Sequence, residues 1–445
     1  EGRAIPAKGL TGPGYDGHTF WDTEAYVLPM LSYAVPRAAA EALRWRLATL
    51  EKARERAREL GLEGAAFPWR TISGAECGAY WPAGTAAFHI NADIGQAVAR
   101  YCDLNDDPDF ERDVGLPLLV ETARLWRSLG HHDAHGAFRI DGVTGPDEYS
   151  AVADNNVYTN LLAQKNLRAA AEFCERYAEA AEAFKVDNEE IASWRDAAEA
   201  MTIPYDAELG VHPQAEGFTD HARWDFEGTD ADDYPLLLNF PYFDLYRKQV
   251  VKQADLVMAM LVRSEAFTAE EKARNFAYYE PLTVRDSSLS ACVQAVLAAE
   301  TGHLELAYDY MGEAALMDLD DLEHNSRDGL HIASLAGTWI AAVCGFGGLR
   351  DHDGVLRFAP RLPERLDRLA FRLEFRGRRL RVEVTSGGTK YSLLEGPPLR
   401  FQHFDEEVDL TDDGLAFGPA PALQPPPEPV HQPSGRAPLR RRPSR

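Results

Sequence analysis

The hydrophobic periodicity changes once along the chain, and this change limits the folds open to it. From about residue 25 to residue 345 the apolar residues recur at helical spacing, and no segment alternates like a strand. After Gly345 the period becomes two, because Leu369, Phe371, Leu373 and Phe375 alternate with other residues before an RGRR turn and a second alternating run. The sequence therefore predicts a large helical domain followed by a small antiparallel β-sheet.

The helical signals are long and numerous. Residues 37–60 follow Pro36 and stop at Gly61, so a proline precedes and a glycine follows a helix-favouring run. Similar runs lie near residues 108–129, 155–185, 188–201, 246–263, 286–301 and 303–318. Helices joined by long, aromatic, glycine-rich loops indicate an α-solenoid closed into a toroid, or a large helical bundle. In a closed barrel of this kind, the loops at one end carry the chemistry.

These patterns divide the chain into three parts. We expect a helical catalytic domain over residues 1–345, a β-sheet domain over 346–417 and a Pro-rich tail with a basic end over 418–445. The tail lacks the apolar residues needed for a core, so we predict that it is disordered.

Charge and cysteine usage exclude several classes of protein. The net charge is −25, which argues against a nucleic-acid partner because such proteins usually carry a basic face. No run of eighteen apolar residues occurs, so we expect no membrane span. The five cysteines are scattered without CxxC spacing, which argues against zinc and predicts reduced thiols in a cytoplasmic protein.

Two aromatic loops have the composition of a sugar site. The first, LTGPGYDGHTFWDTEAYVLP at residues 10–29, contains Trp21 and Asp22; the second spans residues 68–94. Aromatic rings cover the apolar face of a sugar, and carboxylates accept hydrogen bonds from its hydroxyl groups. The alternative interpretation makes Trp21 a core residue and Asp22 a helix N-cap.

An acid pair and a Lys-Gln pair are further candidates. Asp147 and Glu148 lie in GVTGPDEYS at residues 142–150, and Lys252 precedes Gln253 in VVKQADLVM. A Pro-Asp turn with a solvated glutamate would explain the first pair, and a solvated helix edge would explain the second.

Two loops have the composition of an anion site. Ser287 and Ser288 lie where a helix is predicted to begin, and free backbone N–H groups and the helix dipole favour negative charge there. His331 and Ser334 lie in HNSRDGLHIASLAGTW, which could present donors to a phosphate. The alternative is that Asp286 or a serine caps the helix. Since GxxxxGK[ST] does not occur, a nucleotide is not the expected anion.

Seven of these motifs, taken in order, resemble those of the family 65 glycoside hydrolases and phosphorylases over roughly residues 5–405. They are GLTGPGYDGHTFWDTE, YWPAGTAAFHINADI, GVTGPDEYS, NNVYTN, KQADLVM, YYEPLTVRDSSLS and DGLHIASLAGTW. The resemblance implies a mainly α fold, an (α/α)6 barrel followed by a small antiparallel β-sheet domain. It also implies an N-terminal β-sandwich that this sequence does not contain, so we expect a fragment or a truncated gene product, with a homodimer left open.

The resemblance assigns roles to the candidates. Glu148 aligns with the general acid, Trp21, Asp22, Lys252 and Gln253 with the glucose site, and Ser287, Ser288, His331 and Ser334 are candidates for the phosphate pocket. His331 is the strongest of these, because its cationic form would make charge-assisted bonds to an anion. The partners implied are a disaccharide and inorganic phosphate, with no metal and no other cofactor.

The expected reaction is inverting phosphorolysis of an α-linked glucose disaccharide. Glu148 protonates the glycosidic oxygen with a raised pKa to which Asp147 contributes, and phosphate attacks from the opposite face to give β-glucose 1-phosphate. The YWPAGTA stretch ranks trehalose first, then kojibiose or nigerose, then maltose. Two alternatives stay open: an inverting hydrolase with Glu280 as base, and an inactive sugar-binding fragment.

Overall fold

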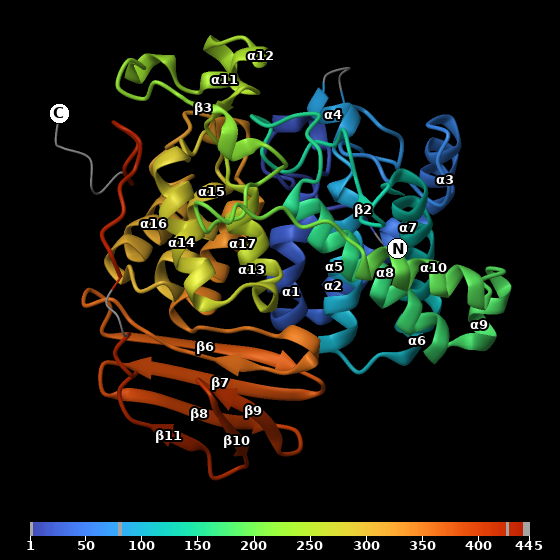
Figure 1. Cartoon of the computed structure of the whole chain (residues 1–445). Coiled ribbons are helices and arrows are strands. Elements are labelled where there is room, and N and C mark those ends of the chain that lie inside the picture. Colours follow the sequence, from blue (N-terminus) through green and yellow to red (C-terminus); the bar gives the residue numbers. More distant parts are fainter. Residues whose placement is uncertain (1–2, 79–81, 424–426, 439–445) are drawn as a thin grey trace.

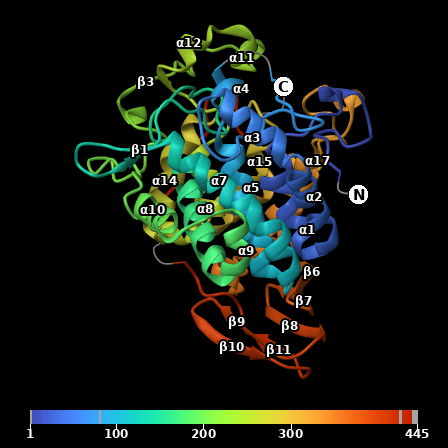
Figure 2. The same ribbon diagram turned by 90° about the vertical axis from the view of Figure 1, so that its right-hand side faces the viewer.

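The computed structural model describes residues 3–78, 82–423 and 427–438. Helices form one large body, and a β-sheet region lies at one end of it in both views (Figures 1 and 2). The longer helices are α1 Leu28–Ala34, α2 Pro36–Ala48, α3 Leu50–Glu59, α5 His89–Leu104, α7 Leu116–Leu129, α8 Val157–Arg176, α10 Asn188–Glu199, α13 Asp255–Val262, α14 Ala269–Tyr279, α15 Ser290–Glu300, α16 Leu304–Leu316 and α17 Ile332–Ile340. The short helices are α4 Pro82–Ala86, α6 Pro108–Phe110, α9 Ala178–Ala183, α11 Leu236–Asn239 and α12 Tyr242–Leu245.

The helical body is a closed barrel. In the described part of the chain, α1, α5, α8, α13, α15 and α17 each pack against the next, and α17 packs back on α1. Outside this ring lie α2, α7, α10, α14 and α16, packed on inner helices. The inner helix α15 is buried on all sides from Ser290 to Ala299, as expected for a helix surrounded by others. This is the (α/α)6 arrangement predicted from the sequence.

Local sequence signals account for several helix ends. Thr268 and Glu271 form a reciprocal capping box at the start of α14. Asn156 caps α8 and Asp187 caps α10, each through its side-chain oxygen. The expected single helix over residues 37–60 is instead two, because the backbone breaks at Thr49 (φ −100°, ψ 4°) between α2 and α3.

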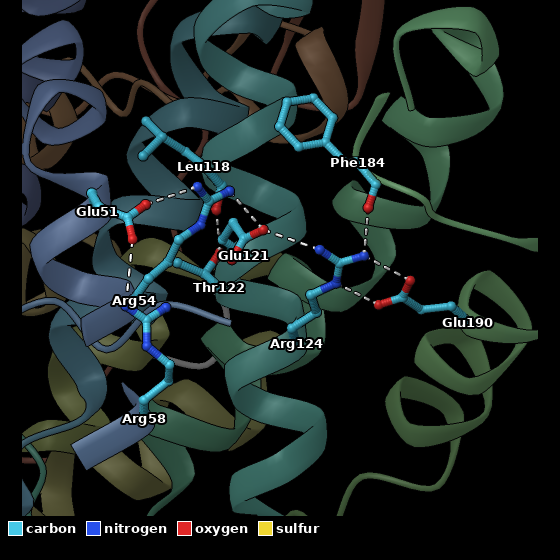
Figure 3. A network of polar contacts seen from close by, with 9 residues as sticks. All are labelled: Glu51, Arg54, Arg58, Leu118, Glu121, Thr122, Arg124, Phe184 and Glu190. Carbon is cyan, nitrogen blue, oxygen red and sulfur yellow. Dashed lines mark hydrogen bonds and ion pairs between the residues drawn. The ribbon is translucent and has the colours of Figure 1, made fainter. Parts of the chain in front are cut away.

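A buried charge network joins three helices on one side of the barrel (Figure 3). Glu121 of α7 accepts hydrogen bonds from Arg54 of α3 and from Arg124, both at 3.0 Å. Arg124 also pairs with both carboxylate oxygens of Glu190 in α10, at 2.7 and 3.0 Å. The Glu121 side chain is only 6% exposed, because α3 packs on α7. The ion pairs with the two arginines compensate its buried negative charge.

The β-region has two sheets. One has the order β11-β8-β7-β6 and is antiparallel; in the other, β9 pairs with antiparallel β10 and with parallel β5. The strands are β5 Arg357–Phe358, β6 Arg368–Phe375, β7 Arg378–Thr385, β8 Gly388–Glu395, β9 Leu399–His403, β10 Glu406–Leu410 and β11 Leu415–Phe417. The predicted turn joins β6 to β7 at Arg376 and Gly377, and Gly377 has the positive φ (70°) that favours glycine.

The alternating residues of β6 and β7 face the core, and their cluster is continuous with that of the barrel. Four strands of two residues each were not foreseen inside the helical part, because they are too short to show alternation. They are β1 His131–His132, β2 Phe138–Arg139, β3 Ala222–Arg223 and β4 Lys248–Gln249. No helix in the described ranges has both the length and the apolar character needed to cross a membrane.

The tail differs from the predicted disorder in its described part. Residues 427–438 form neither helix nor strand, yet they lie against the barrel. Val430 packs on the main core, and Pro433 is buried. The low hydrophobicity of the segment excludes a core of its own but not a position on a core that already exists.

Candidate active site

One pocket near the end of the barrel that carries α11 and α12 collects the candidate residues. It encloses about 970 Å³ of empty space, with open solvent at its mouth included. All nine site residues expected from the sequence line it: Trp21, Asp22, Glu148, Lys252, Gln253, Ser287, Ser288, His331 and Ser334. Residues separated by more than three hundred positions in the sequence therefore share one cavity.

The two adjacent acids point in different directions. Glu148 lines the pocket, whereas Asp147 is fully buried and accepts hydrogen bonds from the backbone N of Lys252 (2.9 Å) and from Gln214 Nε2 (2.8 Å). Burial raises the pKa of Asp147 to about 6. Asp147 therefore anchors the loop, and Glu148 is the carboxyl group available to a ligand.

The acid loop is tied to the start of α13. The Asp147 backbone N donates to Asp255 Oδ1 (2.5 Å), and Asn156 Nδ2 donates to Asp255 Oδ2 (2.7 Å). A Cβ on Gly145 would lie 2.2 Å from Asp255 Oδ2, so only glycine fits there. Close packing against Asp255 thus accounts for the glycine of the GP turn before the acid pair.

Lys252 is the charged partner of Glu148. Its Nζ donates a hydrogen bond to Glu148 Oε2, and the Lys252 side chain is 20% exposed. Burial works against the charge of Lys252, but the neighbouring Glu148 carboxylate outweighs it and raises the pKa of Lys252. The Lys-Gln pair is therefore not a solvated helix edge, since Lys252 lies directly on the proposed acid.

Trp21 and Asp22 form another wall of the pocket. Trp21 is 5% exposed, and its ring packs edge-on against His89 with centroids 5.1 Å apart. Trp21 also belongs to the hydrophobic core, as the alternative interpretation expected, whereas Asp22 stands at the N-cap position of a helical turn without a capping hydrogen bond from its side chain. Burial raises the pKa of Asp22 to about 6. His89 pairs with Asp93 within α5, as expected for a satisfied helix residue.

Gln253 links the acid loop to the serine cluster. Its Nε2 donates to the carbonyl oxygen of Pro146, and its Oε1 accepts from Ser287 Oγ, both at 2.6 Å. Ser334 is buried and donates to the Ala314 carbonyl oxygen at 3.1 Å. The hydroxyl groups of Ser287 and Ser334 therefore donate to protein atoms in this structure.

The expectation of a cationic His331 is replaced by a different arrangement of charge. Asp318 accepts from the ring Nδ1 of His331 (2.6 Å), and Lys8 Nζ lies 3.0 Å from the ring Nε2. Because an ammonium group can only donate, Nε2 is the acceptor and Nδ1 carries the proton. The positive charge in this corner therefore belongs to Lys8, which is 2% exposed.

Lys8, Tyr15 and Asp286 line the pocket but were not among the predicted site residues. Lys8 directly precedes the quoted GLTGPGYDGHTFWDTE segment, and its position beside this glycine-rich loop was the available signal. The alternative in which Asp286 or a serine caps the helix does not hold, because α15 begins at Ser290 without a side-chain cap. Of the YWPAGTA stretch used to rank substrates, residues 79–81 lie outside the described residues.

Glu280 does not fit the role of a hydrolytic base. It is 2% exposed, is absent from the pocket lining, and accepts hydrogen bonds from Tyr310, Gln294 and Gln432. A base must reach the water that it activates. Within the described ranges, no three His, Cys, Asp or Glu side chains group in a way that could hold a metal ion.

Comparison with known proteins places the chain in a family. Residues 1–340 match the model of the glycosyl hydrolase family 65 central catalytic domain, and residues 349–410 match that of the family's C-terminal domain. An uncharacterized glycosyl hydrolase of Mycobacterium tuberculosis (strain H37Rv) is 59% identical over 447 residues, covering 99% of this chain and 56% of that protein. Alpha,alpha-trehalose phosphorylase of Geobacillus stearothermophilus is 45% identical over 418 residues, covering 92% of this chain and 54% of that protein.

A solved structure described as a putative kojibiose phosphorylase from human microbiome has a TM-score of 0.89 and 30% identity, and the match covers 94% of this chain and 63% of that one. The chain spans about half the length of the curated relatives it matches. The catalytic and C-terminal matches together show that the chain belongs to glycosyl hydrolase family 65.

Proposed function

We propose that the protein carrying this chain catalyses the inverting phosphorolysis of an α-linked glucose disaccharide, with β-glucose 1-phosphate and glucose as products. The observation that carries the proposal is one pocket in which the Glu148 carboxyl group shares space with Lys8 and His331, whose Nζ and Nε2 atoms lie 3.0 Å apart. A carboxylic acid and an anion site are the two parts that such a reaction needs.

In the proposed mechanism, protonated Glu148 donates its proton to the glycosidic oxygen as the bond from that oxygen to the anomeric carbon breaks. A phosphate oxygen attacks the anomeric carbon from the opposite face, and the configuration inverts. Phosphate is already anionic, so no second carboxylate is required as base. Lys252 donates to Glu148 in the empty pocket and holds its carboxyl group in place.

Trp21 and Asp22 are proposed to bind the glucose unit that is transferred. The aromatic face of Trp21 covers the apolar side of the sugar, and the Asp22 carboxylate accepts from its hydroxyl groups. Gln253 assists by fixing the acid loop relative to the serine cluster. Lys8 supplies the charge that attracts phosphate, and His331 Nε2 accepts a hydrogen bond either from Lys8 or from a protonated phosphate oxygen.

Trehalose is the proposed disaccharide. The chain is 45% identical to a trehalose phosphorylase and 30% identical to the putative kojibiose phosphorylase of known structure. Kojibiose or nigerose follows in rank, and maltose is last. Glu280 does not fit the role of base in the hydrolase alternative, because its carboxylate is buried among protein hydrogen-bond donors and does not line the pocket.

A substrate panel tests the proposal. Trehalose, kojibiose, nigerose and maltose are each incubated with the protein, with and without inorganic phosphate, and glucose and β-glucose 1-phosphate are measured separately. We expect sugar phosphate only when phosphate is present, with trehalose as the preferred substrate. Glucose release independent of phosphate would instead identify a hydrolase. Absence of any product from all four sugars would favour an inactive sugar-binding fragment.

A further inference from the structure

The basic, Pro-rich tail reaches the wall of the active-site pocket. It runs along the barrel past α16 toward the end where α11 lies (Figure 1). Gln432 Nε2 donates to Glu280 Oε1 at 2.9 Å, and Val430 packs against the barrel core. These contacts fix the tail just before Pro433, which is buried.

Arg436 makes the contacts closest to the site. Its Nη2 donates to Asp286 Oδ1 (2.7 Å), and its Nε donates to the Val284 carbonyl oxygen (2.6 Å). The guanidinium carbon lies 4.4 Å from the centroid of the Tyr234 ring, which adds a cation–π contact. The Arg436 side chain is only 17% exposed, so it is packed against the barrel rather than solvated.

Asp286 also accepts hydrogen bonds from two other segments of the chain. Its side chain is 1% exposed, and its Oδ2 accepts from Tyr149 Oη (2.7 Å) and from the Leu236 backbone N at the start of α11 (2.9 Å). Within the described ranges, Arg436 is the ion-pair partner that the structure gives to Asp286. Removing the guanidinium would leave a buried carboxylate held only by neutral donors, which is costly.

The neighbours of these residues in sequence are the proposed catalytic parts. Tyr149 directly follows Glu148, and Ser287 directly follows Asp286; Asp286 itself lines the pocket. We propose that Arg436 is a positioning residue: by neutralising Asp286 it fixes Tyr149, and through it the acid loop, against the serine turn and α11. The C-terminal tail is then part of the active-site wall, an inference that rests on the proposed function.

A double-mutant cycle on the whole chain tests whether Arg436 acts through Asp286. We expect Arg436→Met to lower kcat by about tenfold to a hundredfold, because small displacements of catalytic groups have effects of this size. In an Asp286→Asn background the same change should cost much less, since the charge to be neutralised is gone. Arg400→Met is the matched control, because Arg400 pairs with Asp409 on an exposed face of the β-region.

If Arg436 had only a structural role, Arg436→Met would lower the melting temperature, and its effect on kcat would not depend on Asp286. Equal losses of kcat in both backgrounds, or an unchanged kcat in Arg436→Met, would overturn the inference. Arg436→Lys keeps the charge and should recover part of the loss; a lysine variant as impaired as the methionine variant would also count against it.

Amide hydrogen exchange separates this inference from the proposed function. In Arg436→Met, exchange should rise over residues 142–151 and 234–246, because the Asp286 contacts to both segments loosen. This readout needs no substrate. Unchanged exchange there would overturn the positioning role alone, whereas absence of sugar phosphate with the unaltered chain would overturn the proposed function alone.

Discussion

Replacing Lys8 by methionine removes the positive charge that lies against His331 Nε2. Lys8 Nζ is 3.0 Å from His331 Nε2 and donates to Asn325 Oδ1 (3.2 Å) and to the Gly329 carbonyl oxygen (3.0 Å). Burial lowers the pKa of Lys8, so an arriving anion gains a partner whose charge is otherwise poorly solvated. Methionine keeps the length of the side chain and removes its charge and donors.

The expected effect can be estimated from this geometry. A hydrogen bond to a charged group contributes about 1.5–3 kcal/mol. Since 1.4 kcal/mol corresponds to a factor of ten, Lys8→Met should raise the KM for phosphate by about 10- to 150-fold. Glucose binding should change little, because Trp21 and Asp22 form a different wall of the pocket.

Initial rates at saturating disaccharide, with phosphate varied, measure this effect directly. Glucose binding is followed separately by calorimetry, and Lys390→Met on the exposed face of β8 is the control. A normal KM for phosphate in Lys8→Met would refute the assignment of charge in this corner. A parallel loss of glucose affinity would show that the pocket had collapsed and would equally refute the separation of the two sites.

The remaining predictions concern the sugar wall, the acid loop and the barrel. The pKa of Asp22 is raised to about 6, so its carboxyl group is protonated below this pH and charged above it. The affinity for glucose, measured by calorimetry, should therefore rise as the pH increases through 6. Asp22→Asn should remove this dependence on pH. Gly145→Ala should lower the free energy of unfolding in urea by about 1–3 kcal/mol through the clash with Asp255, and an unchanged midpoint would contradict it. Arg124→Met leaves Glu121 with one arginine (Figure 3) and should also cost about 1–3 kcal/mol in urea; a loss below about 0.5 kcal/mol would mean that the network is solvated.

The period change in the sequence was sufficient to place the helical and β-sheet parts, because hydrophobic spacing reports directly on which face is buried. The break at Thr49 was not foreseeable, since residues 37–60 contain neither glycine nor proline and only packing ends α2 there. The contacts of residues 427–438 with the barrel were not foreseeable for a related reason. The composition of this segment describes what it can bury by itself and carries no information about a surface elsewhere that accepts it.

The candidate site, too, was predicted only in part from the sequence. Motif resemblance identified nine of the residues that line the pocket and assigned Glu148 as the acid, but it could not show what its neighbour Asp147 does. The hydrogen bonds from Lys252 and Gln214 answer this for Asp147. Lys8 and His331 are 323 residues apart, so their contact, and the resulting tautomer of the histidine, follow from the folded barrel alone.

The central claim is that Glu148 supplies the proton and phosphate supplies the nucleophile. The most direct test is an NMR time course of trehalose with inorganic phosphate, run with the unaltered protein and with Glu148→Gln, and read for the anomer of the sugar phosphate. The account predicts β-glucose 1-phosphate and free glucose in equal amounts, with the rate lower by about 10²–10⁴ in the variant. An α-anomer, glucose formed without phosphate, or a variant of normal rate would contradict it.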